Sequence, residues 1–230
     1  MIKVIAFDLD DTLWHVDPVI IRAEKILNEW FRTRVPGFEY DMRNTSQVRD
    51  QVLSDQPELS GRLTKFRSRV IETALTHHGV AEPPTIAAEA MEIFLTARNQ
   101  VDFFAGAIDA IIKMSADYQL GALTNGNADI HRLGLAQYFS FAFSAEEVGA
   151  PKPAPDLFHK ALSHTGVAAI EMVYVGDDRI KDVDAANAVG LKTIWLRNER
   201  RAGPGESEPD SVIEDISQLP QAIKSIESRE

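Results

Sequence analysis

The chain has 230 residues, of which 24 are basic and 35 acidic, giving a formal net charge of −11, and it contains no cysteine. The shares of hydrophobic and charged residues, 44% and 26%, are typical of a folded domain and exclude global disorder. The acidity argues against broad nucleic-acid binding, which needs a basic face, and the lack of cysteine excludes disulfides, thiolate metal sites and cysteine nucleophiles.

The predicted elements begin with a short strand at residues 3–7, rich in valine and isoleucine and buried on both faces as in a parallel sheet. This stretch is too short for a signal peptide, and no run approaches the roughly 20 apolar residues of a membrane span. We therefore expect a cytoplasmic protein with no membrane partner. Asp17 and Pro18 favour the start of an amphipathic helix, and the pattern stays helical or irregular to about residue 100, with the clearest helices at 60–78 and 85–98.

Strands and helices alternate after Val101. The expected strands lie at residues 120–123, 139–143, 172–175 and 193–196, with a short one near Val212. The expected helices lie at 107–115, 155–164, 181–189 and the C-terminal end, and the stretch 197–210, with Gly203-Pro204-Gly205, is predicted to be an exposed loop. This alternation predicts a parallel sheet covered on both faces.

The chain length corresponds to about one and a half domains. We predict an α/β fold, a Rossmann-like doubly wound parallel sheet, with a core domain of residues 1–14 and 102–230. Residues 15–101 are predicted to form an all-helical domain inserted after the first strand. Because ligands of open parallel sheets bind beyond the carboxyl ends of the strands, an insertion at this point is placed to act as a cap.

Acidic residues follow two of the predicted buried strands. Asp8 and Asp10 come directly after the first strand, and residues two apart in extended chain point the same way, so their carboxylates can converge. Asp177 and Asp182 follow the strand at 172–175 in a similar way, whereas Asp178 and Asp184 are expected to face solvent. Crowded carboxylates repel one another unless a cation compensates, and oxygen ligands suit Mg²⁺. For a single cluster, a solvated acidic turn is the alternative.

Two further sites offer partners for an anion. Thr124, Asn125 and Gly126 end another predicted strand, and their hydroxyl, amide and backbone N–H groups form a corner that suits an anion, an ordinary Asn-Gly turn being the alternative. Lys152 lies between two prolines, where a surface lysine in a rigid loop is the alternative. Together the sites favour phosphoryl transfer, in which a carboxylate attacks phosphorus, Mg²⁺ and donors stabilise the phosphoryl oxygens, and a second carboxyl group handles the proton.

This set of motifs resembles the haloacid dehalogenase superfamily of aspartate-nucleophile phosphatases. The matching pieces occur in the order typical of that family and span residues 4–182. They are Phe7-Asp8-Leu9-Asp10-Asp11-Thr12, Leu123-Thr124-Asn125-Gly126, Pro151-Lys152-Pro153 and Val175-Gly176-Asp177-Asp178-Arg179-Ile180-Lys181-Asp182. The helical insertion corresponds to the cap that this family places after its first motif.

The resemblance implies a catalytic and metal-binding role for three aspartates. Asp8 is expected to be the nucleophile and a Mg²⁺ ligand. Asp10 is expected to be the general acid and base, with its backbone carbonyl on the metal. Asp177 is expected to complete the protein ligands of the Mg²⁺ cofactor.

The resemblance also implies roles for the residues around them. Thr124, Asn125 and Lys152 are expected to bind the phosphoryl group. Thr12 and Asp182 are expected to lie in the surrounding layer, where Asp182 holds either a metal-bound water or Lys152.

Three features refine the resemblance. Asp10, with Thr12, favours a phosphatase, because a halide leaving group needs no proton and dehalogenating relatives lack the second aspartate. Residues 18–24, 66–68 and 124–128 resemble the bacterial flavin mononucleotide phosphatase branch, which also dephosphorylates a phosphoribitylamino-uracil of the riboflavin pathway. Lys181 stands where many relatives have asparagine, a departure that puts the hydrogen bonding around the metal ligands in question.

The leading hypothesis is a Mg²⁺-dependent phosphomonoester hydrolase that acts on a small-molecule phosphate ester, FMN or a riboflavin-pathway phosphate among them, through an aspartyl-phosphate. A phosphomutase or a haloacid dehalogenase of the same superfamily, or a signalling phosphoacceptor, is the alternative. The sequence does not distinguish a monomer from a homodimer.

Several aromatic and basic residues admit two interpretations each. Trp14 either stacks on a substrate ring or packs the hinge between the domains, and Trp30 is expected in the core of the insertion. His77 and His78 fit a polar helix end better than a ligand pair. A run of basic residues either steers an anionic substrate or forms a solvated helix face; it consists of Arg62, Lys65, Arg67 and Arg69.

Overall fold

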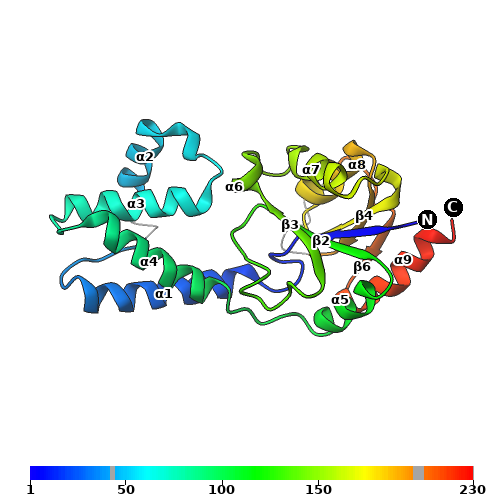
Figure 1. Cartoon of the computed structure of the whole chain (residues 1–230), viewed down its shortest axis with the longest axis horizontal. Helices are drawn as coiled ribbons and strands as arrows, with labels where there is room; N and C mark the ends of the chain where they lie inside the picture. Colours follow the sequence, from blue (N-terminus) through cyan, green and yellow to red (C-terminus); the bar gives the residue numbers. More distant parts are fainter. Residues whose placement is uncertain (42–44, 199–204, 230) are drawn as a thin grey trace. The chain divides into compact units, whose positions relative to one another are not determined.

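The structure, a computed structural model, describes residues 1–41, 45–198 and 205–229. It divides into two compact units: a core unit of Met1–His15 and Asp102–Glu230, and a helical unit of Val16–Val101. Figure 1 labels most of the helices and strands of both. None of the helices in the described part of the chain combines the length and the apolar character that crossing a membrane requires.

Six parallel strands form the sheet of the core unit, in the order β3-β2-β1-β4-β5-β6. Their bounds are β1 Val4–Phe7, β2 Gln119–Thr124, β3 Phe139–Ser144, β4 Met172–Gly176, β5 Lys192–Leu196 and β6 Ser211–Ile213. The chain builds one half of the sheet outward from β1 and then returns to β4 on its other side, so the strand order reverses between β1 and β4. Open sheets of this kind bind ligands at that point. The predicted α/β, Rossmann-like fold class is confirmed.

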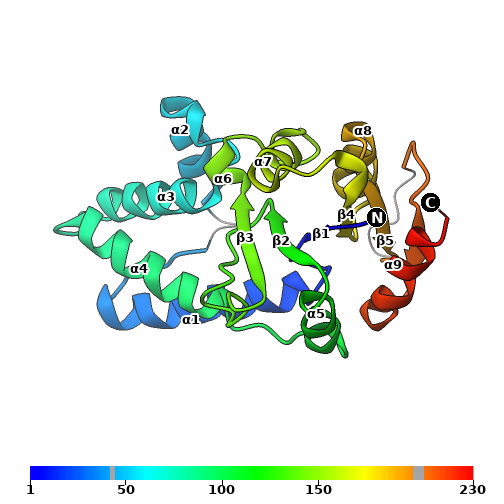
Figure 2. The same ribbon diagram turned by 45° about the vertical axis from the view of Figure 1, so that its right-hand side comes forward.

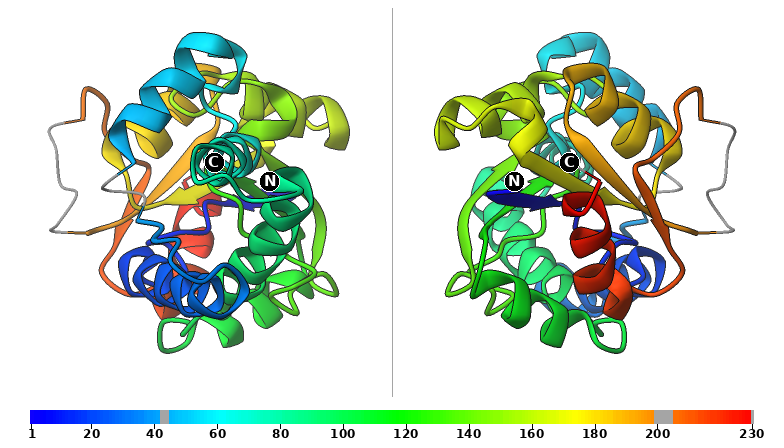
Figure 3. Two further views of the ribbon diagram at one scale, coloured as in Figure 1. Left: turned by 90° about the vertical axis from the view of Figure 1, so that its left-hand side faces the viewer. Right: turned by 90° about the vertical axis from the view of Figure 1, so that its right-hand side faces the viewer.

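Helices cover both faces of the sheet (Figures 2 and 3). The helices α5 and α9 lie on one face, and α7 and α8 lie on the other. Their bounds are α5 Ala107–Ser115, α7 Asp156–Thr165, α8 Ala185–Val189 and α9 Leu219–Glu227, with the short elements α6 Ala145–Val148, η2 Ala169–Glu171, η3 Arg179–Asp184 and η4 Ile216–Gln218 between them. Because both faces are covered, every residue of β1 is buried, which explains its continuous apolar sequence.

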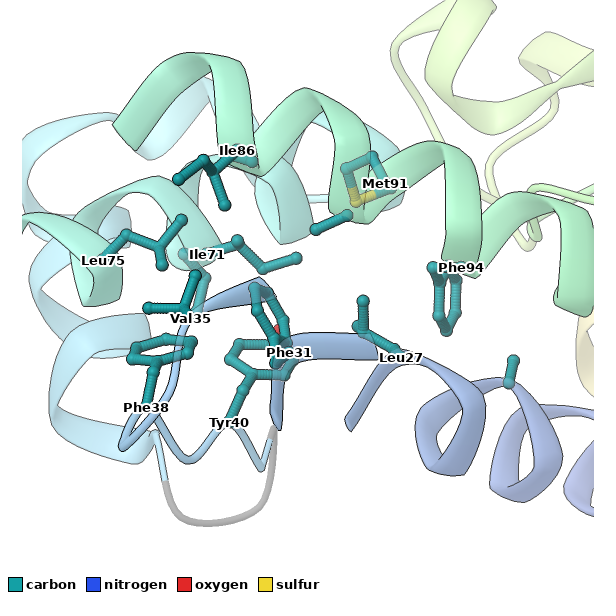
Figure 4. Packing of buried hydrophobic residues seen from close by; sticks show 14 of the residues in the cluster. Leu27, Phe31, Val35, Phe38, Tyr40, Ile71, Leu75, Ile86, Met91 and Phe94 are labelled. Atoms are coloured by element: carbon teal, nitrogen blue, oxygen red, sulfur yellow. The ribbon is translucent and has the colours of Figure 1, made fainter. Parts of the chain in front are cut away.

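The helical unit contains α1 Val16–Arg34, α2 Ser46–Asp55, the single turn η1 Pro57–Leu59, α3 Leu63–His77 and α4 Pro83–Arg98. Its apolar core is built by α1, α3 and α4 (Figure 4). Phe31 of α1 lies at the centre of an aromatic group, with ring centroids 5.0 Å from Phe38 and 5.5 Å from Tyr40. A second aromatic contact joins Trp30 to Phe31 at 5.1 Å. This unit therefore has a hydrophobic core of its own.

Two helices of this unit differ from the sequence prediction. The helix α1 begins at Val16, one residue before the expected cap, so Asp17 lies in its first turn. The helix α2 was not predicted as a separate element. Val52 is its only buried residue, so its sequence lacks the apolar stripe by which an amphipathic helix is recognised.

The predicted helix at 181–189 begins earlier and with a different geometry. The chain first makes the π-helical turn η3 and becomes α-helical only in α8. The Asp178 carboxylate caps the turn by accepting from the N–H groups of Ile180 and Lys181 at 3.0 and 2.9 Å. Asp178 was expected to face solvent; it is half-buried, and its carboxylate has this capping role in addition. Turns of the π type are frequent at functional sites, and this one follows β4 at the point where the strand order reverses.

Asp184 was also expected to face solvent, but it is half-buried. Its carboxylate accepts from the backbone N–H groups of Glu206 and Ser207 at 2.9 and 2.8 Å. These contacts tie the described end of the predicted loop to η3, so that part is not a free loop. Gly203 and Pro204 of the same prediction lie outside the described residues.

Candidate active site

The strands β1 and β4 end side by side, and the first acidic residue of each motif follows directly. The pairing places Phe7 beside Val175, and the N–H of Asp8 donates to the Val175 carbonyl at 2.9 Å. Asp8 therefore leaves the sheet next to the end of β4, where Asp177 follows. Both residues stand at the reversal of the strand order.

Three carboxylates meet at this edge of the sheet. Asp8, Asp177 and Asp182 each place an oxygen within 4.8 Å of the others, and all three residues are buried. Burial raises the pKa of Asp8 to about 7; the Lys152 ammonium opposes the shift, and the charge of Asp182 adds to it. A buried acid with such a pKa either holds a proton near neutral pH or takes a cation in its place.

The cluster holds one cation of the protein itself, the ammonium of Lys152. Its Nζ donates to Oδ1 of Asp8 at 2.8 Å, to Oδ1 of Asp182 at 2.7 Å and to the Tyr174 hydroxyl at 2.6 Å, which uses all three N–H groups. Burial by itself would lower the pKa of Lys152, but the attraction of Asp182 and Asp8 outweighs it and raises the pKa well above its ordinary value. The side chain is 2% exposed, so it is a fixed charge of the interior.

Two side chains hold Lys152 in place. Asn125 donates from Nδ2 to the Lys152 carbonyl at 2.8 Å and accepts at Oδ1 from the Lys152 N–H at 2.7 Å. Tyr174 donates its hydroxyl proton to the Leu123 carbonyl at 3.0 Å while accepting from Lys152. Burial raises the pKa of Tyr174 well above its ordinary value, so the hydroxyl keeps this proton. Asn125 was predicted to bind phosphate; its side chain positions Lys152, a role that its motif did not indicate.

The Asp182 carboxylate is engaged at both oxygens. Oδ1 accepts from Lys152, and Oδ2 accepts from the N–H of Asp178 at 3.0 Å. A Cβ on Gly176 would lie 2.4 Å from the Cγ of Asp182, so only glycine allows this approach to the end of β4. Of the two partners predicted for Asp182, the structure places it on Lys152. Lys181 pairs with the Asp178 carboxylate at 2.9 Å, so this departure from the family pattern leaves the contacts of Asp182 intact.

Asp177 is held from three sides. Its Oδ1 lies 3.4 Å from the hydroxyl of Thr12, and its Oδ2 accepts from Nδ2 of Asn198 at 3.2 Å. The indole N–H of Trp195 donates to its backbone carbonyl at 2.8 Å. Thr12 therefore lies beside the acid cluster.

The side chain of Asp10 lies outside the group of three carboxylates. Its Oδ1 accepts from the indole Nε1 of Trp14 at 3.0 Å. Trp14 itself is fully buried and packs edge-on against Phe103, with ring centroids 5.6 Å apart. Of its two interpretations, stacking on a substrate or packing, the structure shows packing. Thr124 uses its hydroxyl oxygen to accept from the N–H of Gly126 at 2.9 Å, which closes the turn at the end of β2.

Three contributors to the site were not predicted: Tyr174, Asn198 and Trp195. Tyr174 and Trp195 lie within apolar strand sequences, where an aromatic residue looks like core, and Asn198 follows β5 without a motif around it. The only sequence feature that sets Tyr174 apart is a hydroxyl in an otherwise apolar strand, and by itself it does not indicate Lys152 as the partner.

The donor set fits a hard divalent cation. All of the ligand atoms in the cluster are oxygens, which Mg²⁺ prefers. Asp182 is bonded to the Lys152 ammonium and to a backbone N–H, whereas in the described part of the chain the contacts of Asp8 use Oδ1 alone. The oxygens of Asp177 lie against a neutral hydroxyl and a neutral amide. Asp8 and Asp177 are therefore the carboxylates best placed to hold an ion.

A family model described as haloacid dehalogenase-like hydrolase matches residues 2–190. The match covers the whole set of acidic and basic residues described above, from Asp8 to Asp182.

Curated proteins with a similar sequence include phosphatases. The chain is 32% identical over 201 residues to the 5-amino-6-(5-phospho-D-ribitylamino)uracil phosphatase YigB of Escherichia coli, covering 86% of this chain and 84% of that protein. It is 34% identical over 160 residues to the phosphoserine phosphatase of Thermus thermophilus, covering 67% of this chain and 64% of that protein.

A solved structure with a different name is also similar. The structure of 2-haloacid dehalogenase from Pseudomonas syringae pv. Tomato DC3000 superposes with a TM-score of 0.92 at 37% identity, covering 98% of this chain and 99% of that chain. Similar proteins therefore bear the names of both phosphatases and a dehalogenase, and the choice between these activities depends on the residues of this chain.

The Tyr174 hydroxyl is expected to stabilise the core unit through Lys152. In Tyr174→Phe, the buried ammonium loses one of three acceptors and the Leu123 carbonyl loses its donor, so the free energy of unfolding should fall by about 1–3 kcal/mol. Urea denaturation measures this change. Tyr118→Phe is the matched control, because the Tyr118 hydroxyl bonds the partly exposed Glu227 at 3.1 Å and its loss should cost clearly less. Equal losses in the two variants would contradict the role of Tyr174.

Proposed function

The chain belongs to the haloacid dehalogenase-like hydrolase family, and from this premise we propose that it hydrolyses the phosphate monoester of a small metabolite through an aspartyl-phosphate on Asp8. The single observation that carries the proposal is the buried group of Asp8, Asp177 and Asp182 around the Lys152 ammonium, at the reversal of the strand order. Several curated relatives are phosphatases by name, among them those of Escherichia coli and Thermus thermophilus.

Each residue of the site has its own role in the proposed reaction. The Asp8 carboxylate attacks phosphorus, and the bond to the leaving oxygen breaks as Asp10 donates its proton to that oxygen. Water then attacks the aspartyl-phosphate, Asp10 takes up the proton, and the bond to Asp8 breaks. Thr124 and Lys152 are the proposed donors to the transferred group, and one N–H of Lys152 would exchange its present acceptor for a phosphoryl oxygen. Lys152 also holds Asp8 in one orientation through Oδ1.

Asp8 and Asp177, with the backbone carbonyl of Asp10, are the proposed ligands of Mg²⁺. When bound, the ion supplies the positive charge that lets an anionic carboxylate approach a phosphate dianion. Asn198 and Thr12 orient Asp177 toward this position through its two oxygens.

A phosphoribityl compound is the proposed substrate class. The name of the Escherichia coli relative supports it, as does the likeness of residues 18–24, 66–68 and 124–128 to the flavin mononucleotide phosphatase branch. Two of these stretches meet inside the helical unit, where Arg67 pairs with Glu24 at 2.5 Å and its guanidinium lies 3.9 Å from the centre of the Phe94 ring. Arg67 is thus a largely buried, organised residue and not part of a solvated basic face.

A haloacid dehalogenase is the second candidate, and the name of the similar Pseudomonas syringae structure favours it. The second aspartate argues against it. A halide leaves as a stable anion, whereas an alkoxide needs a proton, so Asp10 is useful to a phosphatase and superfluous to a dehalogenase.

A substrate panel tests the proposal. We expect inorganic phosphate to be released fastest, by kcat/KM, from 5-amino-6-(5-phosphoribitylamino)uracil or FMN. Phosphoserine, glyceraldehyde 3-phosphate and a hexose phosphate should be poorer substrates, and 2-chloropropionate should release no chloride. Chloride release without phosphate release would contradict the proposal, as would transfer of the phosphoryl group to a second position of the substrate.

Asp8→Asn tests the covalent step. Asparagine keeps the shape of the side chain and removes the nucleophilic charge, so phosphate release should fall by about 10³-fold or more. Asp109→Asn, an exposed site on α5, is the matched control and should retain the activity of the unchanged protein. Mass spectrometry of acid-quenched enzyme should find the added phosphoryl group on the unchanged protein and not on Asp8→Asn. Turnover by Asp8→Asn would refute the mechanism.

Mg²⁺ binding is expected to depend on pH through Asp8. Because burial raises the pKa of Asp8 to about 7, the metal-free acid is mostly protonated at pH 6 and mostly ionised at pH 8. Binding needs the ionised form, so the affinity should weaken as pH falls below 7, by up to about tenfold per pH unit. Titration calorimetry in two buffers of different ionisation enthalpy measures the released proton.

Asp177→Asn should weaken Mg²⁺ binding in the same titration, with Asp109→Asn as the control. An affinity that is constant between pH 6 and 8 would rule out Asp8 as the titrating ligand. An unchanged affinity in Asp177→Asn would remove Asp177 from the ligand set.

A further inference from the structure

The backbone of Asp177 is held by a side chain of the neighbouring strand. The pairing of β4 with β5 ends where Gly176 lies beside Trp195, and Asp177 is the next residue along the chain. Asp177 is buried, so its carbonyl needs a hydrogen-bond donor from the protein. The indole N–H of Trp195 supplies this donor at 2.8 Å. A side chain thus fixes the backbone at the point where the chain leaves β4 for η3.

The indole of Trp195 is itself held by two cations. The guanidinium carbons of Arg179 and Arg197 lie 4.9 and 5.4 Å from the centre of its ring, within the range of cation–π attraction. Arg179 also donates from Nη2 to the Ser207 carbonyl at 2.6 Å, and Arg197 pairs with Glu214 at 2.7 Å. Because both guanidinium groups are anchored elsewhere as well, they restrict the rotation of the buried ring and so the direction of its N–H.

The same segment also reaches the carboxylate. Asn198, three residues after Trp195, donates from Nδ2 to Oδ2 of Asp177 at 3.2 Å. The stretch from Trp195 to Asn198 therefore contacts Asp177 at its backbone and at its side chain. Groups that orient a metal ligand in this way raise the affinity for the ion, because the ligand is already in position when the ion arrives. The indole is neutral and only donates, so it adds no charge to the site.

We propose that Trp195 is a positioning residue of the metal site, whose N–H fixes the backbone from which the Asp177 carboxylate reaches Mg²⁺. This inference rests on the proposed function, in which Asp177 is a ligand of the ion. Trp195 acts on the ion only through Asp177. Its loss should therefore weaken the binding of Mg²⁺ while every ligand remains present.

Two variants remove the N–H in different ways. Trp195→Phe shortens the ring system, whereas replacement of Trp195 by 3-benzothienylalanine conserves the volume and carries sulfur in place of the N–H. We expect the Kd for Mg²⁺, measured by titration calorimetry on the metal-free protein, to rise about tenfold in both variants. Incorporation of 5-fluorotryptophan at position 195 keeps the N–H and should keep the affinity of the unchanged protein.

Trp30→Phe is the matched control. It makes the same chemical change in the helical unit, where Trp30 packs against Phe31, and should leave the Kd for Mg²⁺ unchanged. Phosphate release gives a second readout. In both variants without the N–H it should fall at low Mg²⁺ and return to nearly that of the unchanged protein at about tenfold higher Mg²⁺, because the ligands are intact.

A merely structural role of Trp195 predicts a different result. The protein with 3-benzothienylalanine, which keeps the packing, would then bind Mg²⁺ as tightly as the unchanged protein, and that outcome would overturn the inference. A loss of activity that added Mg²⁺ does not restore would also overturn it. If the unchanged protein binds Mg²⁺ but hydrolyses no phosphate ester, the proposed function fails and the comparison of affinities still decides the role of Trp195. Absence of Mg²⁺ binding in the unchanged protein would refute both.

Discussion

The buried ammonium of Lys152 is the interaction on which the candidate site depends. An unpaired charge in this position would cost several kcal/mol, and truncating one partner of a buried pair is correspondingly damaging. The structure meets this cost with three acceptors on the ammonium and two hydrogen bonds on the backbone of the same residue. Asp8 and Asp182 can stay together only because this cation lies between them. The residue thus organises the carboxylates before any ligand arrives.

The sheet and the π turn make this arrangement possible. β1 and β4 are neighbours at the reversal of the strand order. Asp8 and Asp177 therefore lie at the same edge of the sheet although they are 169 positions apart in the sequence. Asp182 comes from η3, and its approach needs the missing side chain of Gly176. A regular α-helix beginning at Lys181 was predicted here. The wider turn capped by Asp178 instead begins at Arg179 and directs the Asp178 N–H onto Asp182.

The parts of the site that follow a strand end were predictable, because an acid directly after a buried apolar run is visible in the sequence. Asp8 and Asp177 belong to this class, and the strands of the sheet were located for the same reason. Lys152 stood out because it lies between two prolines. Tyr174 and Trp195 could not be recognised, because their polar atoms act from within buried strands. The contact of Asn125 with Lys152 was not foreseen, since it joins segments 27 residues apart and pairings of that kind leave no local pattern. The roles of these residues in catalysis remain predictions.

The charge of the cluster also bears on the proposed function. With all acids ionised, three carboxylates and one ammonium leave two negative charges in a buried site, which would repel a phosphate dianion. A divalent ion held by Asp8 and Asp177 would cancel them. A proton on Asp8 removes one charge but also removes the nucleophile, so it is no substitute. The Asp10 side chain is not one of the three clustered carboxylates and accepts from the Trp14 indole, so its charge does not enter this sum.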